Sequence, residues 1–188
     1  MITQHNLAGN IVYSLHDENA NRSFCERLLT NCHRVYNKYM NIYARDNFSY
    51  FRTPYSMDPK TAGPGYQFEP EDRKIELDFE KYCKESLDSL LSKDFELQDM
   101  WYLYQPNESW IDNPPHEHLT AHWVAVMYLE LTPGDSIIFY DSENNSEAYE
   151  PNIGEVIFFE GNAFHKPGPS IGNRRISVNA EFTERFII

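Results

Sequence analysis

The chain has 188 residues and a formal net charge of −13, because 29 acidic residues outnumber 16 lysines and arginines. A chain of this length can bury about 70% of its unfolded surface, which suffices for one hydrophobic core. We therefore expect a single domain over residues 1–188. The acidic balance excludes a general binder of nucleic acids or anionic membranes, since both would repel the chain at long range. A hydrophobic content of 41% excludes a disordered acidic tail.

The three cysteines form no C-x-x-C pair, which is typical of reduced thiols in a cytosolic protein. No run approaches the roughly 18 continuous apolar residues of a membrane span. The first ten residues lack the basic start and the apolar stretch of a signal peptide. We therefore expect a cytoplasmic protein without a membrane partner.

The first half of the chain is predicted to be helical. Apolar residues recur near the 3.6-residue period in two segments, one opening near residue 23 and one spanning about residues 70–92. We expect residues 20–94 to form a flanking region with these two helices. Between them, residues 46–69 combine prolines and glycines with interleaved aromatics. This long segment is either an ordered lid over a pocket or a loop packed on the sheet by its own aromatics.

From residue 95 onward, short runs of β-branched and aromatic residues alternate with turn residues. The predicted strands are residues 101–104, 122–131, 136–140, 155–160 and 175–186. Many short strands at this spacing indicate a sandwich or a barrel. The predicted fold class is therefore mainly β with flanking helices, in which two N-terminal helices precede a β core at residues 95–188.

Four of the seven histidines lie between positions 116 and 165. His116 and His118 follow Pro114 and Pro115, which fix an extended entry into a strand. Side chains alternate along an extended chain, so His116 and His118 point to the same face. Two imidazoles in this arrangement are a natural metal chelate.

A second set of candidate site residues lies after the H-x-H pair in the sequence. His165 ends a strand–turn–strand pattern over residues 154–165, and Arg175 and Ser177 share one face of the next predicted strand. A guanidinium fork beside a hydroxyl donor is a receptor for a carboxylate. Taken alone, Arg175 is also typical of a surface ion pair in an acidic protein.

Together, the H-x-H pair, the distal histidine and the R-x-S pair make a specific pattern. Residues 101–186 resemble the iron(II)- and 2-oxoglutarate-dependent oxygenases, and in particular the short, prolyl-4-hydroxylase-like ones of bacteria and phages. The resemblance rests on Pro115-His116-Glu117-His118, residues 124–129, 133–135, 138–141 and 154–165, and Arg175-Ile176-Ser177-Val178-Asn179. It implies a double-stranded β-helix, which is a jelly-roll of the cupin type, with flanking helices.

The resemblance also implies an activity. Members of this family bind Fe(II), consume 2-oxoglutarate and O2, and usually hydroxylate a C–H bond while 2-oxoglutarate is decarboxylated to succinate. His116 and His165 would be metal ligands, and Arg175 with Ser177 would hold the far carboxylate of 2-oxoglutarate. Tyr104 and Tyr128 are either phenol donors to that carboxylate or core aromatics. No catalytic residue beyond the metal ligands is assigned.

The primary substrate and the oligomeric state have no signature in the sequence. By analogy we expect a peptide or protein residue or a small molecule as the substrate.

The sequence departs from the family at His118, where the usual motif has Asp or Glu. Three interpretations stay open. The metal site consists of His116, His118 and His165, or a carboxylate comes from elsewhere, with Asp141 ranked ahead of Glu117, or the site has lost turnover and only binds.

The role of His122 bears on which of the alternative functions applies. It lies four residues after His118, so it falls on the same face of an unbroken strand. It is either a fourth metal ligand of the cupin kind or a packed histidine outside the ligand set. The alternative functions are therefore a cupin-type metalloenzyme without a co-substrate and a non-catalytic metal-binding or interaction module on the same fold.

Overall fold

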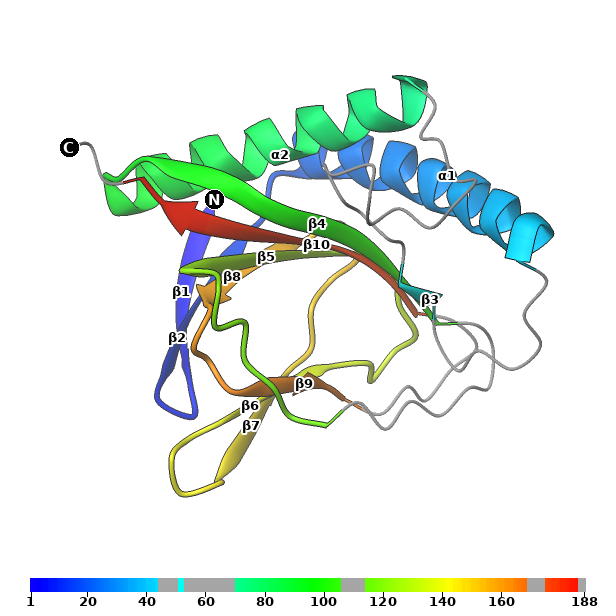
Figure 1. Cartoon of the computed structure of the whole chain (residues 1–188). Coiled ribbons are helices and arrows are strands. Elements are labelled where there is room, and N and C mark those ends of the chain that lie inside the picture. The colour runs from blue at the N-terminus through cyan, green and yellow to red at the C-terminus, as the bar shows by residue number, and fades with distance from the viewer. Residues whose placement is uncertain (44–50, 53–69, 106–113, 169–174, 186–188) are drawn as a thin grey trace.

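The computed structural model describes residues 1–43, 51–52, 70–105, 114–168 and 175–185. In these ranges two sheets lie one above the other, and both helices cover the outer face of the larger sheet (Figure 1). The helices are α1 (Glu18–Tyr43) and α2 (Pro70–Leu91). The strands are β1 (Ile2–Leu7), β2 (Asn10–Leu15), β3 (Phe51–Arg52), β4 (Phe95–Gln105), β5 (Trp123–Glu130), β6 (Ile137–Tyr140), β7 (Ser146–Tyr149), β8 (Val156–Glu160), β9 (His165–Pro167) and β10 (Arg175–Glu184).

The larger sheet has the strand order β1-β2-β8-β5-β10-β4-β3, and the smaller sheet has the order β7-β6-β9. The strand pairs of both sheets are antiparallel. An isolated bridge between His116 and His165 adds the segment before β5 to the smaller sheet, beside β9. These paired antiparallel sheets are consistent with a jelly-roll, and the predicted mainly β class is confirmed.

The residues of strand β5 contribute to two hydrophobic cores, one on each face of the larger sheet. Seven of its eight residues are buried. Ala125 and Met127 belong to the core between the larger sheet and the helices, whereas Val124 and Val126 belong to the core between the two sheets. Because successive side chains point to opposite faces, a continuous apolar run is what a strand covered on both faces requires.

Helix α2 packs on the larger sheet through one apolar stripe. Ile75, Phe79, Cys83 and Leu87 recur every four residues, and all four are buried. Each large side chain buried in this way contributes roughly 1.5–3 kcal/mol. All three cysteines of the chain are free and buried in the same layer, in agreement with the expectation of reduced thiols.

The predicted order of elements needs a correction, because the helices do not come first. The β1–β2 hairpin precedes α1 and pairs with β8, so the larger sheet extends beyond residues 95–188. Ala8 and Gly9 form the turn of the hairpin, both at positive φ (48° and 78°). A two-residue hairpin turn of type I′ needs positive φ at both of its central residues. Strand β7, of four residues, is also absent from the predicted set, and the short strand expected to end at His165 begins there instead, as β9.

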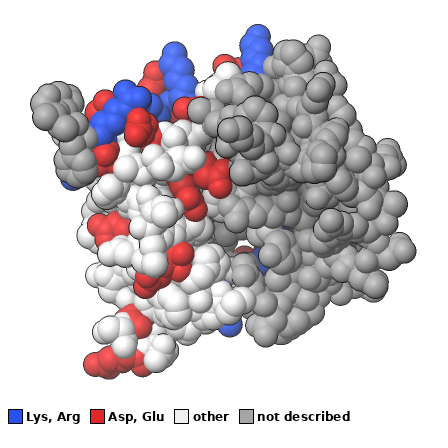
Figure 2. Space-filling view, in the orientation of Figure 1, with Lys and Arg blue, Asp and Glu red and all other residues white. Residues whose placement is uncertain are grey.

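The predicted lid at residues 46–69 lies outside the described residues, apart from the two residues of β3, which pair with β4. Its role as a lid therefore stays a prediction. Most of the visible Lys and Arg side chains lie over the helices at the top of the described face, among acidic side chains that are also spread over the rest of it (Figure 2). Among the helices of the described residues, none is long and apolar enough to cross a membrane.

Candidate metal centre

Three histidines meet between the two sheets. Each of His116, His118 and His165 offers one ring nitrogen, and these atoms lie within 4.8 Å of one another. The backbone N–H groups of His116 and His165 each donate to the carbonyl of the other residue, at 2.9 and 3.0 Å. The ring of His118 stacks on that of His165, with centroids 5.1 Å apart. The predicted placement of His116 and His118 on the same face therefore holds.

Each of the three rings turns its Nδ1 toward an oxygen that only accepts hydrogen bonds. The pairs are His116 with Pro114 O at 3.0 Å, His165 with Ala163 O at 2.8 Å, and His118 with Glu181 Oε1 at 2.6 Å. A neutral imidazole in such a pair carries its proton on Nδ1. Nε2 then keeps its lone pair, which is the form that binds a metal ion.

Burial keeps the innermost of these rings neutral. His165 is 5% exposed and packs against Phe139 and Phe159. Desolvation lowers the pKa of His165 to about 3, and the nearby His116 and His118 act in the same direction, although the hydrogen bond to the Ala163 carbonyl opposes them. A proton therefore does not compete with a metal ion for His165 at neutral pH.

Gly161 lets the turn after β8 touch the segment that carries His118. The Gly161 carbonyl accepts a hydrogen bond from the His118 N–H at 2.7 Å, and the Gly161 N–H donates to the His122 carbonyl at 2.9 Å. A Cβ atom at Gly161 would lie 2.0 Å from the Ala121 oxygen and 2.8 Å from the His118 oxygen. Only glycine fits this close approach, which fixes the position of His118 against β8.

Replacing Gly161 by alanine is expected to push residues 118–121 away from β8. Overpacking of this kind costs roughly 1–3 kcal/mol of unfolding free energy, or about 2–4 °C in Tm for each kcal/mol in a chain of this size. Binding of a divalent ion should weaken as well, because His118 moves. Thermal unfolding and a Co²⁺ titration measure both effects, with the exposed Ser142→Ala as control. Wild-type values for Gly161→Ala would contradict the close approach.

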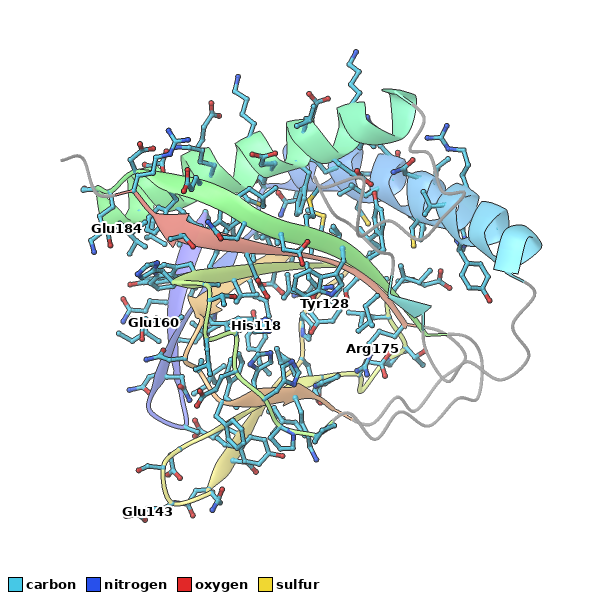
Figure 3. All side chains as sticks on the ribbon, in the orientation of Figure 1. His118, Tyr128, Glu143, Glu160, Arg175 and Glu184 are labelled. Atoms are coloured by element: carbon cyan, nitrogen blue, oxygen red, sulfur yellow. The ribbon has the colours of Figure 1, made fainter. Side chains whose placement is uncertain are left out.

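One cavity of about 340 Å³ joins the histidines to the predicted carboxylate receptor. Arg175 and Ser177 line this cavity together with all three histidines. In Figure 3, His118 and Arg175 point into the same space between the sheets, with Tyr128 between them. The remaining lining residues are Trp101, Leu103, Glu117, Val126, Tyr128, Ile137, Pro167 and Asn179. Two sites that lie far apart in the sequence thus face a single cavity.

Arg175 is the first residue of β10, and its guanidinium is buried, with the whole residue 4% exposed. Its Nη1 donates to the carbonyl of Gly168 at 3.0 Å and, more weakly, to that of Ser136 at 3.4 Å. Both acceptors are backbone atoms where β9 ends and β6 begins, so the smaller sheet orients this side chain. A buried, oriented guanidinium differs from the surface ion pair that was the simpler interpretation of Arg175.

Ser177 and Tyr128 lie directly opposite each other on β10 and β5. Both are buried, and both line the cavity. Burial raises the pKa of Tyr128 to about 12, although the charge of Arg175 acts in the opposite direction. The Tyr128 phenol therefore keeps its proton and is available as a donor. The backbone of Tyr104 pairs with Ile176, but its side chain lies outside the described part of the chain, so its assignment stays a prediction.

Two residues considered as further metal ligands lie elsewhere, and these interpretations are corrected. His122 is exposed, and its Nδ1 accepts a hydrogen bond from the Glu184 N–H at 3.2 Å. Asp141 accepts hydrogen bonds from Glu143 and Asn145 in the turn between β6 and β7. Strand β5 starts at Trp123, after a turn at residues 119–120, so His122 does not continue the face of His118. Neither residue belongs to the group of three histidines.

Sequence reasoning missed Glu181, Trp101 and Asn179. Glu181 holds the Nδ1 of His118, and the Trp101 ring stacks on that of His118 with centroids 5.9 Å apart. Asn179 donates to Ser177 Oγ at 3.2 Å. A signal existed for two of them, because Arg175, Ser177, Asn179 and Glu181 alternate along β10 and share one face.

The donor set fits a divalent metal ion. The three ring nitrogens lie within 4.8 Å of one another, and all three histidines line the same cavity. Neutral imidazoles are common ligands of Fe(II), Co(II) and Zn(II). The group of three histidines can therefore hold a metal ion, and the same cavity offers a cation and hydroxyl groups to an anionic molecule beside it.

No family model matches the chain, and no curated protein matches its sequence. Solved structures do match its fold. An oxidoreductase of the 2OG-Fe(II) oxygenase family from Burkholderia pseudomallei aligns with a TM-score of 0.52 and 14% identity, over 61% of this chain and 58% of that one. A prolyl-4-hydroxylase from Pseudomonas putida aligns with a TM-score of 0.58 and 15% identity, over 93% of each chain.

A third similar structure is the viral collagen prolyl hydroxylase from Paramecium Bursaria Chlorella virus-1, with a TM-score of 0.57 and 12% identity, over 94% of this chain and 96% of that one. The chain therefore has the fold of the 2OG-Fe(II) oxygenases, as the sequence resemblance implied. Both prolyl hydroxylases align over nearly the whole of this chain, as do several of the other solved structures.

Proposed function

We propose that the protein is an iron(II)- and 2-oxoglutarate-dependent dioxygenase. One observation carries the proposal: a cavity of about 340 Å³ is lined both by the three histidines and by the buried Arg175 with Ser177. A metal site alone fits many activities, and so does a carboxylate receptor alone. A molecule with an anionic group at each end, such as 2-oxoglutarate, makes use of both at once.

His116, His118 and His165 would hold the iron through Nε2. Arg175, Ser177 and the protonated Tyr128 would bind the far carboxylate of 2-oxoglutarate. When bound, iron and 2-oxoglutarate supply the activation of O2 and the hydroxylation of a C–H bond, with 2-oxoglutarate decarboxylated to succinate. The apolar lining, which includes Val126 and Ile137, would exclude water from that reaction.

The proposed substrate class rests on analogy with two of the similar structures, which are prolyl hydroxylases, one of them of collagen. We therefore propose a peptide or protein residue as the primary substrate, with a small molecule as the alternative. The rest of the molecule is acidic, which favours a neutral or basic substrate.

The experiment is anaerobic titration of the purified protein with Fe(II) and then with 2-oxoglutarate. A visible charge-transfer band that needs both additions supports the proposal. Metal binding without the band, and without any affinity for 2-oxoglutarate, would overturn it in favour of a metalloenzyme without a co-substrate. A protein that binds no divalent ion would favour a non-catalytic interaction module.

A further inference from the structure

The hydrogen bond behind His118 differs from those behind the other two histidines. His116 and His165 each face a neutral backbone carbonyl, whereas His118 faces the carboxylate of Glu181 at 2.6 Å. Both side chains of this pair are only 12% exposed. A short contact to a charged acceptor in a place with little water is stronger than one to a carbonyl.

Glu181 is held firmly in this position. It lies on β10 between two neighbouring strands and pairs with Val124 of β5 and with Asp99 of β4. A register shift follows directly after it, between Glu181 and Phe182. Pairing on both sides fixes the backbone of Glu181. The low exposure of its side chain and the 2.6 Å contact place the carboxylate against the His118 ring.

The Glu181 carboxylate contacts the residue that replaces the acid of the resembled family's metal-binding motif. The sequence pattern of the resembled family has an acid at the third position of its H-x-D or H-x-E motif, and this chain has His118 there. Exchange of a carboxylate ligand for a neutral imidazole raises the net charge of a metal site by one unit. Glu181 returns one negative charge at the back of that same imidazole. Of the three ligand histidines, His118 is the one with an anionic partner.

We propose that Glu181 is a positioning residue that acts through His118 and supplies, just outside the metal ligands, the negative charge that a carboxylate ligand supplies inside them. The inference rests on the metal site of the proposed function. Glu181 keeps the proton of His118 on Nδ1, orients the ring, and increases electron donation from Nε2 to the ion. The three-histidine site thereby becomes electrostatically similar to a site with two histidines and an acid.

The test compares three variants by anaerobic titration with Co²⁺, whose absorption spectrum reports its ligands. Glu181→Gln keeps an oxygen that accepts from Nδ1 but removes the charge, and we expect about tenfold weaker binding. Glu181→Ala removes both and should weaken binding by about 100-fold. Glu143→Gln removes the same charge at the tip of the β6–β7 turn, far from His118 (Figure 3), and should match the wild type.

A purely structural role for Glu181 would lower Tm but would leave the Co²⁺ spectrum unchanged, so the spectrum distinguishes the two roles. We expect the spectrum to shift in Glu181→Gln while the variant stays folded. Wild-type affinity and spectrum in Glu181→Gln would overturn this inference and leave the proposed function intact. A wild-type protein that binds no divalent ion would overturn the proposed function and this inference with it.

Discussion

Replacing His116 by alanine is expected to lower the affinity for a divalent ion by about 100-fold or more. Loss of a hydrogen-bond partner behind a ligand histidine typically costs about 10–100-fold, so loss of the ligand itself costs at least the upper value. His116 contributes one of three ring nitrogens that lie within 4.8 Å of one another. Its side chain is only half-buried, so the alanine variant keeps its core. Anaerobic calorimetry with Fe²⁺ or Co²⁺ measures the change.

His122→Ala is the matched control. It removes an imidazole only four residues beyond His118, but His122 is exposed and accepts its hydrogen bond from the Glu184 backbone. We expect wild-type affinity in this variant. An undiminished affinity in His116→Ala would contradict the three-histidine site. A loss in His122→Ala would restore the fourth-ligand interpretation that the geometry removes.

The part of the site that could be predicted depends on local geometry. His116 and His118 share a face because an extended chain alternates its side chains, and the two prolines before them keep it extended. Arg175 and Ser177 share a face of β10 for the same reason. In each case the spacing along the chain decides the arrangement, and no knowledge of the neighbouring strands is needed.

Glu181 could not be assigned in the same way. It lies 63 positions after His118 in the sequence, and the two meet because β10 pairs with β5 in one particular register. The alternation of polar residues along β10 places Glu181 on the right face but does not say which side chain it meets.

The hairpin β1–β2 was missed for a different reason. Its turn at Ala8 and Gly9 lacks the Asn-Gly or Asp-Gly pair that marks such turns most clearly. The sequence of β1, Ile-Thr-Gln-His-Asn-Leu, has four polar residues in a row, so the apolar alternation that marks a strand is weak there. Pairing with β8 is what stabilises this hairpin, and that contact joins segments more than 140 residues apart.

The inner face of β10 combines the two ends of the site. Arg175 at its start is anchored to the smaller sheet, and Glu181 near its end contacts His118. Ser177 and Asn179 lie between them. A single strand therefore carries a residue at each end of the site, and a change at Arg175 should leave the contact between Glu181 and His118 in place.

Arg175→Lys tests this independence, and it is expected to abolish most of the affinity for 2-oxoglutarate. Lysine keeps the charge but loses the planar fork that donates two parallel hydrogen bonds to a carboxylate. Truncation of one partner of a buried, charged hydrogen-bonded pair costs about 2–5 kcal/mol, which corresponds to about 30-fold or more in affinity. Calorimetry with 2-oxoglutarate in the presence of Co²⁺, which does not turn over, measures the loss.

The affinity for Co²⁺ alone should stay at the wild-type value in Arg175→Lys, because Arg175 hydrogen-bonds to Gly168 and Ser136 and not to the histidines. Ser177→Ala should show a smaller loss for 2-oxoglutarate, of about 1 kcal/mol, since it removes one neutral hydrogen bond. A folded Arg175→Lys variant with wild-type affinity for 2-oxoglutarate would contradict the carboxylate receptor. 2-Oxoglutarate would then bind without the guanidinium, and Arg175 would serve to anchor the start of β10 to the smaller sheet through Gly168 and Ser136.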